Sequence, residues 1–266
     1  MIHECGAALS VAYRPFVPTG TEPVLCFEND RILLAGDAAE IRFPTASEIE
    51  GDKRYLFTLG NVPYFEGTAA AFGGYRYEAP FFLRSALPRE RAFAGVTGLH
   101  LARWYRDRRF CGRCGRPMRH SKTERAMTCG CGNVVYPQIC PAVIVAITTP
   151  DRRRICLTRY NRPNARWSLV AGYTEIGETP EETVRREALE ETGLRVKNVR
   201  YYRSQPWGLS GSLLLGFFCE TENPDDLRPD GEELREACWF TPEEIDFTDD
   251  GFSLTRHMIE VFRTGS

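Results

Sequence analysis

A group of glutamates with helical spacing is the part of this sequence best suited to chemistry. Glu187 and Glu191 are four residues apart, and Glu190 follows Glu187 by three, so all three side chains project from one side of a helix. Exposed like charges at this spacing repel by roughly a few tenths of a kcal/mol per pair. A hard divalent cation such as magnesium or manganese, held between the oxygens, would remove that penalty. Charge runs are usually solvated helix faces, so a metal site and a bland acidic face are the two interpretations.

The residues around these glutamates predict one helix with defined ends. Thr179 suits the N-cap, Pro180 suits the first helical position, and Glu182 lies three residues after the cap and completes a capping box. Gly193 is placed to end the helix in a left-handed conformation. We therefore expect a helix of roughly three to four turns. Glu178, just before its start, can reach the glutamate face.

The whole stretch from Gly172 to Leu194 resembles the Nudix box. The positions in register are Gly172, Glu178, Arg186, Glu187, Glu190, Glu191, Gly193 and Leu194, and only Ala188 is smaller than the aliphatic residue usual there. The resemblance implies a Nudix hydrolase, which cleaves a nucleoside diphosphate linked to another group.

The same resemblance implies roles for the residues of the box. Glu187 and Glu191 would be the main ligands of magnesium or manganese, and the Ala171 carbonyl and Glu190 would contribute. Arg186 would orient the carboxylates through bidentate pairing. Either Glu191 or a hydroxide on the metal beside it would activate the water, although the glutamate that does so differs among Nudix enzymes. Divalent ions suit a pyrophosphate diester because they neutralise its charge and lower the pKa of bound water.

Four cysteines predict a second metal site. Cys111 and Cys114 form one Cys-x2-Cys knuckle, and after fourteen residues Cys129 and Cys131 form a shorter Cys-x-Cys knuckle. This is the arrangement of a structural zinc ribbon, in which four thiolates leave no open position for catalysis. His120 is a conceivable substitute ligand, although four cysteines already complete the set.

The alternative for the ten cysteines is disulfides or free thiols. Disulfides need an oxidising compartment, and the first residues lack the basic and apolar segments of a secretory signal. We therefore expect a cytoplasmic protein with no membrane association, since no apolar run approaches the ~18 residues that cross a bilayer. Several of the remaining cysteines lie in apolar runs and are expected to be buried thiols.

A Ser-Gln-Pro-Trp motif follows the box and resembles the signature of the NADH pyrophosphatase branch of the Nudix hydrolases. The matching residues are Gln205, Pro206, Trp207 and Ser212, whereas Gly208, Leu209 and Ser210 replace the Pro-Phe-Pro of that branch. The resemblance implies that the matching residues bind substrate. A simple β-turn with a core tryptophan is the alternative.

Other positions agree with that branch, from about residue 100 onward. Tyr136 and Tyr173 would offer aromatic faces to the nicotinamide, with Tyr136 contributed across a homodimer interface. Glu233 aligns with a further metal-binding glutamate of the family, although Glu232 is one residue away. Two more candidates for substrate binding are Arg84 and Thr255.

The hydrophobic pattern predicts three domains in an α/β chain. Residues 1–105 alternate short apolar runs with turn residues, which indicates a β-rich domain. Residues 106–135 hold the zinc ribbon, and a helix at 100–109 leads into it. Residues 136–266 contain six apolar strands, the box helix and a closing helix at 253–264. This order indicates an α/β/α sandwich with a mixed sheet, the Nudix fold.

Together these features predict a metal-dependent enzyme that hydrolyses NADH, and less readily NAD⁺, to AMP and NMNH or NMN. The formal charge of −2 over 266 residues argues against a dedicated nucleic-acid surface, but residues 103–122 are rich in arginine. An alternative is therefore removal of the NAD cap from RNA by the same chemistry, with these arginines holding the strand. A solvated basic face is the simpler interpretation of the arginines. A hypothesis of another class is a catalytically idle nucleotide-binding regulator.

Overall fold

The computed structural model describes residues 1–13 and 16–265, which form two compact units. The N-terminal unit comprises residues 2–139 together with 207–211. The C-terminal unit comprises Met1 with residues 140–206 and 212–266. The division into three domains stays a prediction, because the ribbon falls in the same unit as the residues before it.

The C-terminal unit is built on a six-stranded mixed sheet in the order β14-β15-β11-β12-β16, with β13 paired to β11. Strands β11 and β15 run parallel, whereas β12 and β13 pair with β11, and β16 with β12, in antiparallel fashion. The strands are β11 (Cys140–Thr148), β12 (Ile155–Tyr160), β13 (Val170–Tyr173), β14 (Val196–Trp207), β15 (Ser212–Thr221) and β16 (Leu234–Phe240). The short 3-10 turns η2 (Pro224–Asp226) and η3 (Pro242–Glu244) lie in the connections.

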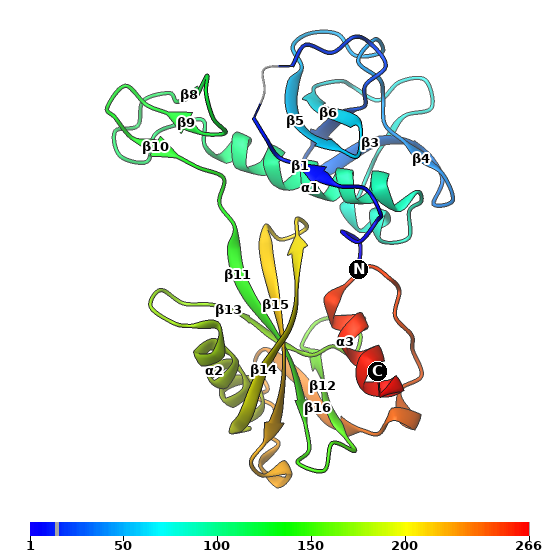
Figure 1. The fold of residues 1–266 in the computed structure, drawn as a ribbon, viewed down its shortest axis with the longest axis vertical. Coiled ribbons are helices and arrows are strands. Elements are labelled where there is room, and N and C mark those ends of the chain that lie inside the picture. The colour runs from blue at the N-terminus through cyan, green and yellow to red at the C-terminus, as the bar shows by residue number, and fades with distance from the viewer. Residues whose placement is uncertain (14–15, 266) are drawn as a thin grey trace. The chain divides into compact units, whose positions relative to one another are not determined.

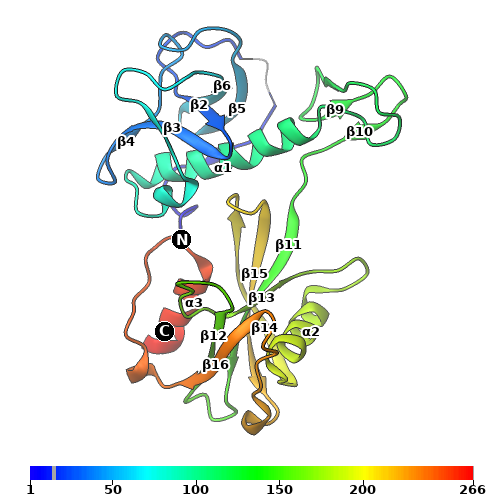
Figure 2. The ribbon, with the colours of Figure 1, turned by 180° about the vertical axis from the view of Figure 1, so that it is seen from behind.

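Two helices cover opposite faces of this sheet, as Figures 1 and 2 show: α2 (Pro180–Thr192) and α3 (Leu254–Thr264). On one face, Val184 and Ala188 of α2 are fully buried against alternate residues of β11, such as Val143. On the other face, a Cβ added at Gly216 would lie 2.7 Å from the Met258 sulfur of α3. The predicted α/β/α sandwich with a mixed sheet is confirmed.

The N-terminal unit contains a seven-stranded sheet in the order β1-β5-β6-β2-β3-β4, with β7 paired to β3. The strands are β1 (Leu9–Ser10), β2 (Val24–Glu28), β3 (Arg31–Gly36), β4 (Ile41–Arg42), β5 (Arg54–Leu59), β6 (Val62–Gly67) and β7 (Arg76–Glu78). A 3-10 turn, η1 (Pro80–Arg84), precedes the helix α1 (Arg89–Asp107). Among the described residues, no helix is both long and apolar enough to span a bilayer.

Helix α1 is longer than predicted, because it begins at Arg89 rather than near residue 100. Gly95 and Gly98 lie in the part of the helix outside the predicted range, where the helix meets its neighbours. An added Cβ would lie 2.3 Å from the Leu25 side chain at Gly98 and 2.9 Å from the Leu83 side chain at Gly95. The two glycines therefore permit close packing, which offsets their low helix propensity.

Three short antiparallel strands follow α1 and form the ribbon, in the order β10-β9-β8. They are β8 (Arg119–His120), β9 (Met127–Thr128) and β10 (Val134–Val135). Contacts tie the ribbon to the rest of its unit: the Tyr13 hydroxyl donates to the Ser121 carbonyl at 3.0 Å, and Arg125 donates to the Leu56 carbonyl.

Candidate metal-dependent active site

The predicted helix and both of its ends are present. The Thr179 side chain accepts a hydrogen bond from the Glu182 amide, and the Glu182 carboxylate accepts one from the Thr179 amide at 2.8 Å. Gly193 ends α2 with φ of 72°. These caps fix the rotation and length of the helix, and Glu187, Glu190 and Glu191 therefore have defined positions on it.

Arg186 joins the carboxylates of this region into one network. Its Nε donates to one oxygen of Glu178 at 2.6 Å, and its Nη2 donates to the other at 2.9 Å. Its Nη1 donates to Glu187 at 2.8 Å and to Glu190 at 3.0 Å. The bidentate pairing lowers the pKa of Glu178 to about 2. Arg186 thus holds the flank of the acidic face in one arrangement.

Glu191 has no such partner. Its side chain points into the unit with 3% of the residue exposed, and neither carboxylate oxygen has a hydrogen-bond partner among the described residues. Loss of solvent, reinforced by the charges of Glu233, Glu187 and Asp230, raises the pKa of Glu191 to about 8. A buried carboxylate normally pairs with a cation. An unpaired carboxylate in this position is therefore what we expect of a metal ligand.

Glu187 lies against the backbone of β13. A Cβ added at Gly172 would lie 1.9 Å from the Glu187 carboxyl carbon, so only glycine leaves room for that side chain. Burial also raises the pKa of Glu187, although Arg186 opposes the shift. The need for glycine at position 172 of the box is therefore steric. Ala171, whose carbonyl was predicted to be a ligand, is the preceding residue of the same strand and pairs with Ile144.

The loop before β16 brings Glu233 to the site. Its charge raises the pKa of both Glu191 and Glu187, whereas Glu232 is not among the groups that do so. These electrostatics favour Glu233 over Glu232, and Glu233 as a metal ligand stays a prediction. Asp230, which the sequence analysis missed, shapes this loop: its carboxylate accepts from the Glu233 amide at 3.3 Å and the Leu234 amide at 2.9 Å.

The donor set fits a hard divalent cation. The carboxylates of Glu187, Glu191 and Glu233 influence one another electrostatically, and they offer the oxygen ligands that magnesium and manganese take. In this structure Arg186 still holds Glu187 and Glu190, and the glutamate oxygens do not gather as closely as the four cysteine sulfurs do. Among the described residues, only those cysteines form a group of three or more metal-binding side chains whose ligand atoms all lie within 4.8 Å.

The predicted substrate residues divide between the two units. In the C-terminal unit, Tyr173 is 51% exposed at the end of β13 and accepts a hydrogen bond from Ser212 at 3.3 Å. Thr255 lies in α3 of the same unit. Three others belong to the N-terminal unit: Arg84 in η1, Tyr136, whose hydroxyl donates to Glu124 at 3.2 Å, and Trp207.

Gln205 has a structural position. It is fully buried, its amide nitrogen donates to the Phe252 carbonyl at 2.7 Å, and its oxygen accepts from the Leu254 amide at 2.6 Å. Both ends of the side chain thus bind the backbone where α3 begins, instead of facing a substrate. Pro206, the next residue, is exposed.

The replacement of the expected Pro-Phe-Pro also has a reason in the structure. At Gly208, an added Cβ would lie 2.3 Å from the Val96 carbonyl oxygen of α1. The Arg103 side chain of the same helix donates to the Leu209 carbonyl at 2.6 Å. The turn between β14 and β15 therefore follows the backbone of α1 so closely that proline does not fit at position 208.

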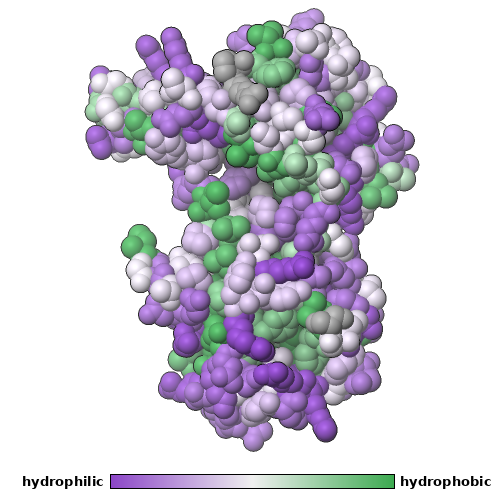
Figure 3. Space-filling model, in the orientation of Figure 1, coloured by the Kyte–Doolittle hydropathy of each residue, from purple (hydrophilic) through white to green (hydrophobic). Residues whose placement is uncertain are grey.

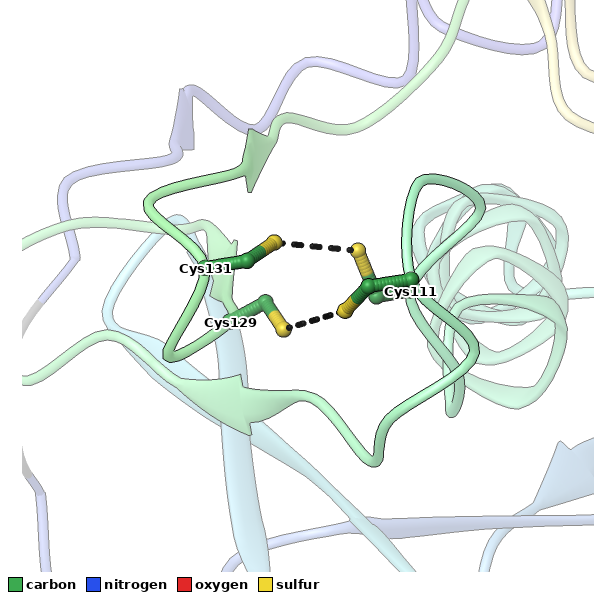
Figure 4. Close-up of side chains that lie close together, drawn as sticks. Cys111, Cys129 and Cys131 are labelled. Atoms are coloured by element: carbon green, nitrogen blue, oxygen red, sulfur yellow. Dashed lines mark hydrogen bonds between the residues drawn. The ribbon is translucent and has the colours of Figure 1, made fainter.

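The four predicted zinc ligands converge. All sulfur atoms of Cys111, Cys114, Cys129 and Cys131 lie within 4.8 Å of one another. Figure 4 shows the two knuckles facing each other, with sulfur separations of 3.7 Å for Cys111–Cys131 and 3.5 Å for Cys114–Cys129. This arrangement can hold a tetrahedral metal ion.

Backbone geometry explains how the shorter knuckle still works. Gly132 has φ of 85° and its amide donates to the Cys129 carbonyl at 2.9 Å, which closes a tight turn around Cys131. Arg116 donates to the Cys114 sulfur at 3.5 Å and lowers the pKa of that thiol to about 6, which favours the thiolate. His120 is not part of the group, and its ring packs on Tyr105 with centroids 5.1 Å apart.

Comparison with known proteins shows which families this chain resembles. The model of the NUDIX domain matches residues 139–262. The chain is 42% identical over 165 residues to proteins named NAD-capped RNA hydrolase NudC from Salmonella typhi and from Citrobacter koseri. The match covers 61% of this chain and spans 63% of the length of those relatives.

A solved structure has the same fold. The NUDIX hydrolase from Nitrosomonas europaea superimposes with a TM-score of 0.51 at 22% sequence identity. The superposition covers 59% of this chain and 90% of that one. At this identity the likeness concerns the fold alone.

Proposed function

Residues 139–262 of this chain are a NUDIX domain, and from that premise we propose that the protein hydrolyses the pyrophosphate bond of NADH and NAD⁺. The products are AMP with NMNH or NMN. The observation that carries the proposal is the orphaned, buried carboxylate of Glu191 among further glutamates. Such a group has little purpose in a structural role, because an unpartnered buried carboxylate destabilises the fold.

A magnesium or manganese ion, held by Glu187, Glu191 and Glu233 with Glu190 and the Ala171 carbonyl, would polarise the phosphate and lower the pKa of a coordinated water. The chain's own residues prepare that site. Arg186 keeps the neighbouring carboxylates ionised and oriented through five hydrogen bonds, one of them to the Tyr173 carbonyl at 2.9 Å. Glu191, once unprotonated, is placed to accept a proton from the attacking water.

Two observations support a nicotinamide dinucleotide as the substrate. The half-exposed ring of Tyr173 lies at the end of β13, two residues after Ala171, and is hydrogen-bonded to Ser212. A planar ring can stack on it there. The relatives at 42% identity carry the name NAD-capped RNA hydrolase, and an NAD cap contains the same pyrophosphate bond. We further propose that the protein acts as a homodimer in which Tyr136 completes the site of the partner.

The relatives' name also favours a second substrate, RNA that carries an NAD cap. Cleavage would then release NMN and leave a 5′-phosphate on the RNA. The bond and the residues that cleave it are unchanged, and only the group attached to the adenosine differs.

For the four cysteines we propose a structural zinc ion. Four thiolates complete its coordination and leave no position for water or substrate. Its contribution is to hold the knuckles of the ribbon together, since β8, β9 and β10 are each two residues long.

Product analysis tests the hydrolysis directly. NADH, NAD⁺, ADP-ribose and a diadenosine polyphosphate are incubated with the protein and magnesium or manganese, and nucleotides are separated by chromatography. We expect AMP and NMNH from NADH, and a loss of roughly 10²–10⁴-fold in kcat for Glu191→Gln. The matched control is Glu181→Gln, which changes an exposed glutamate in the first turn of the same helix. Wild-type turnover by Glu191→Gln, or no AMP from any dinucleotide, would refute the proposal.

A further inference from the structure

The C-terminal unit contains a pocket of about 490 Å³ that the proposed hydrolysis does not use. Its walls are the C-terminal ends of β11 and β15, residues 200–202 of β14 and the C-terminal turn of α3. In Figure 3, a patch of hydrophobic residues is visible on this unit beside α3. Apolar and aromatic side chains with a few polar groups among them are typical of a site for a small molecule.

The pocket is separate from the glutamate site in both position and face of the sheet. Glu187 packs against Gly172, which pairs with Val143 of β11. Thr148, in the wall of the pocket, lies five residues further along β11, roughly 16 Å away. Val143 packs beneath α2, and because successive side chains alternate between the faces of a sheet, Thr148 faces α3. A ligand in this pocket therefore does not touch the metal site.

Aromatic rings form the apolar part of the pocket and are held in place. The rings of Tyr202 and Phe218 meet edge to face, with centroids 5.2 Å apart and planes at 84°. The Tyr202 hydroxyl is hydrogen-bonded to Nε2 of His257 at 3.0 Å, and Nδ1 of His257 is hydrogen-bonded to Asp249 at 3.0 Å. Phe262 of α3 adds a third ring, and like Phe218 it is only partly buried. The wall is thus ordered before a ligand binds, which lowers the entropic cost of binding.

One positive charge of the pocket has no partner. Glu220 accepts two hydrogen bonds from Arg152, at 2.8 and 3.0 Å, and one from Asn198 at 2.8 Å. These hydrogen bonds lower the pKa of Glu220, so its carboxylate is ionised near neutral pH and balances Arg152. Arg200 forms no hydrogen bond or ion pair within the part of the chain that the structure describes. The pocket therefore offers one unpaired guanidinium to an anion.

We propose that this pocket binds a small aromatic anion, with its ring against Phe218 and Phe262 and its carboxylate or phosphate group on Arg200. A guanidinium binds either of these groups through two parallel hydrogen bonds. The carbonyl groups at the C-terminal end of α3 carry partial negative charge, so the anionic group lies toward β14 and the ring lies beside the helix. An aromatic ligand gains ring-to-ring contacts that an aliphatic chain lacks. The proposal does not depend on hydrolysis of a dinucleotide.

Calorimetric titration of the full chain with 2-naphthoate and with 2-naphthyl phosphate, in the absence of magnesium and manganese, tests the proposal. The two probes share one ring system, so the tighter of them identifies the preferred anionic group. We expect Arg200→Met, which keeps the length of the side chain without its charge, to weaken the tighter probe at least about ten-fold. We expect Phe262→Leu to weaken it by roughly two- to ten-fold. Two matched controls, Arg195→Met and Phe81→Leu, change exposed residues outside the pocket and should bind like wild type.

Several results would overturn the proposal. These are no binding of either probe by wild type at about 1 mM, unchanged affinity in Arg200→Met, equal losses in the control variants, or equally tight binding of decanoate, which has no ring. The melting temperature and NADH cleavage are measured on every variant and should match wild type, since the changed residues lie outside the glutamate site. If wild type binds the probes but cleaves no dinucleotide, the proposed function fails and this proposal stands.

Discussion

At the scale of single residues, Glu191 carries an electrostatic conflict that the chain does not resolve by itself. Its carboxylate is buried beside other acids and has no donor within residues 1–13 and 16–265, and its pKa is raised from 4.5 to about 8. Near neutral pH the group therefore binds a proton more strongly in the folded protein than in the unfolded chain. A divalent cation would replace that proton, so metal binding and protonation compete for the same oxygens.

This competition predicts how stability depends on pH. Because the folded-state pKa is raised, the stabilisation is full below pH 4.5 and is lost as the pH rises through about 8. Without added magnesium or manganese, thermal melts of wild type should show stability falling between these values, by at most a few kcal/mol. Glu191→Gln lacks the titrating group and should show a flatter profile.

Manganese provides the control for this prediction. At pH 8 it should raise the melting temperature of wild type and have a much smaller effect on Glu191→Gln. Parallel pH profiles for the two proteins, or an equal response to manganese, would contradict the prediction.

At the scale of elements, the hydrogen bonds of Gln205 connect β14 to the start of α3. Gln205→Ala would leave the Phe252 carbonyl and the Leu254 amide without partners in a buried place, which costs roughly 1–3 kcal/mol. Urea unfolding should show this loss of stability. The KM for NADH should stay unchanged, because the side chain does not face a substrate. A raised KM with unchanged stability would restore the substrate-binding role that the motif suggested.

The secondary structure was predictable where local signals and packing agree. Helix α2 begins and ends as predicted because Thr179, Glu182 and Gly193 encode its caps locally. The first half of α1 was not predicted. It contains Gly95 and Gly98, which are weak helix formers in isolation and are explained only by their contacts with Leu83 and Leu25. Such contacts join residues far apart in the sequence, so no local pattern reveals them.

The site was predictable to a similar extent. The spacing of the glutamates places them on one helix, and the cysteine spacing brings four sulfurs together as expected. Two features were not visible in the sequence. Asp230 acts through the backbone amides of a loop, and Gln205 lies in a motif that suggested binding but is buried against α3. Both roles depend on which backbone amides and carbonyls lack a hydrogen-bond partner within the secondary structure, and the fold decides this.

At the scale of the whole molecule, the ribbon is part of the N-terminal unit and has almost no regular structure of its own. We therefore predict that wild type binds one zinc ion per chain and that the double variant Cys111→Ser/Cys114→Ser binds none. Hydrogen exchange in β8, β9 and β10 should then accelerate by at least about two orders of magnitude, since the metal supplies most of the folding free energy of such modules.

Cys238→Ser is the matched control, because it removes an exposed thiol of the C-terminal unit. It should leave the zinc content and the exchange rates unchanged. Full zinc occupancy in the double variant would show that another set of ligands holds the ion.

The turn at residues 207–211 affects whether the two units could be exchanged separately between genes. Its neighbours in the sequence belong to the C-terminal unit, but its own contacts, from Gly208 to Val96 and from Leu209 to Arg103, belong to the N-terminal one. The polypeptide therefore passes between the two bodies more than once, and no single cut separates them cleanly. A gene fragment that carried only residues 140–266 into another protein would include residues 207–211 without the helix α1 that they contact. Related proteins should therefore contain both units in one polypeptide. Substitutions in α1 should be accompanied by substitutions in residues 207–211, because the two segments are in contact.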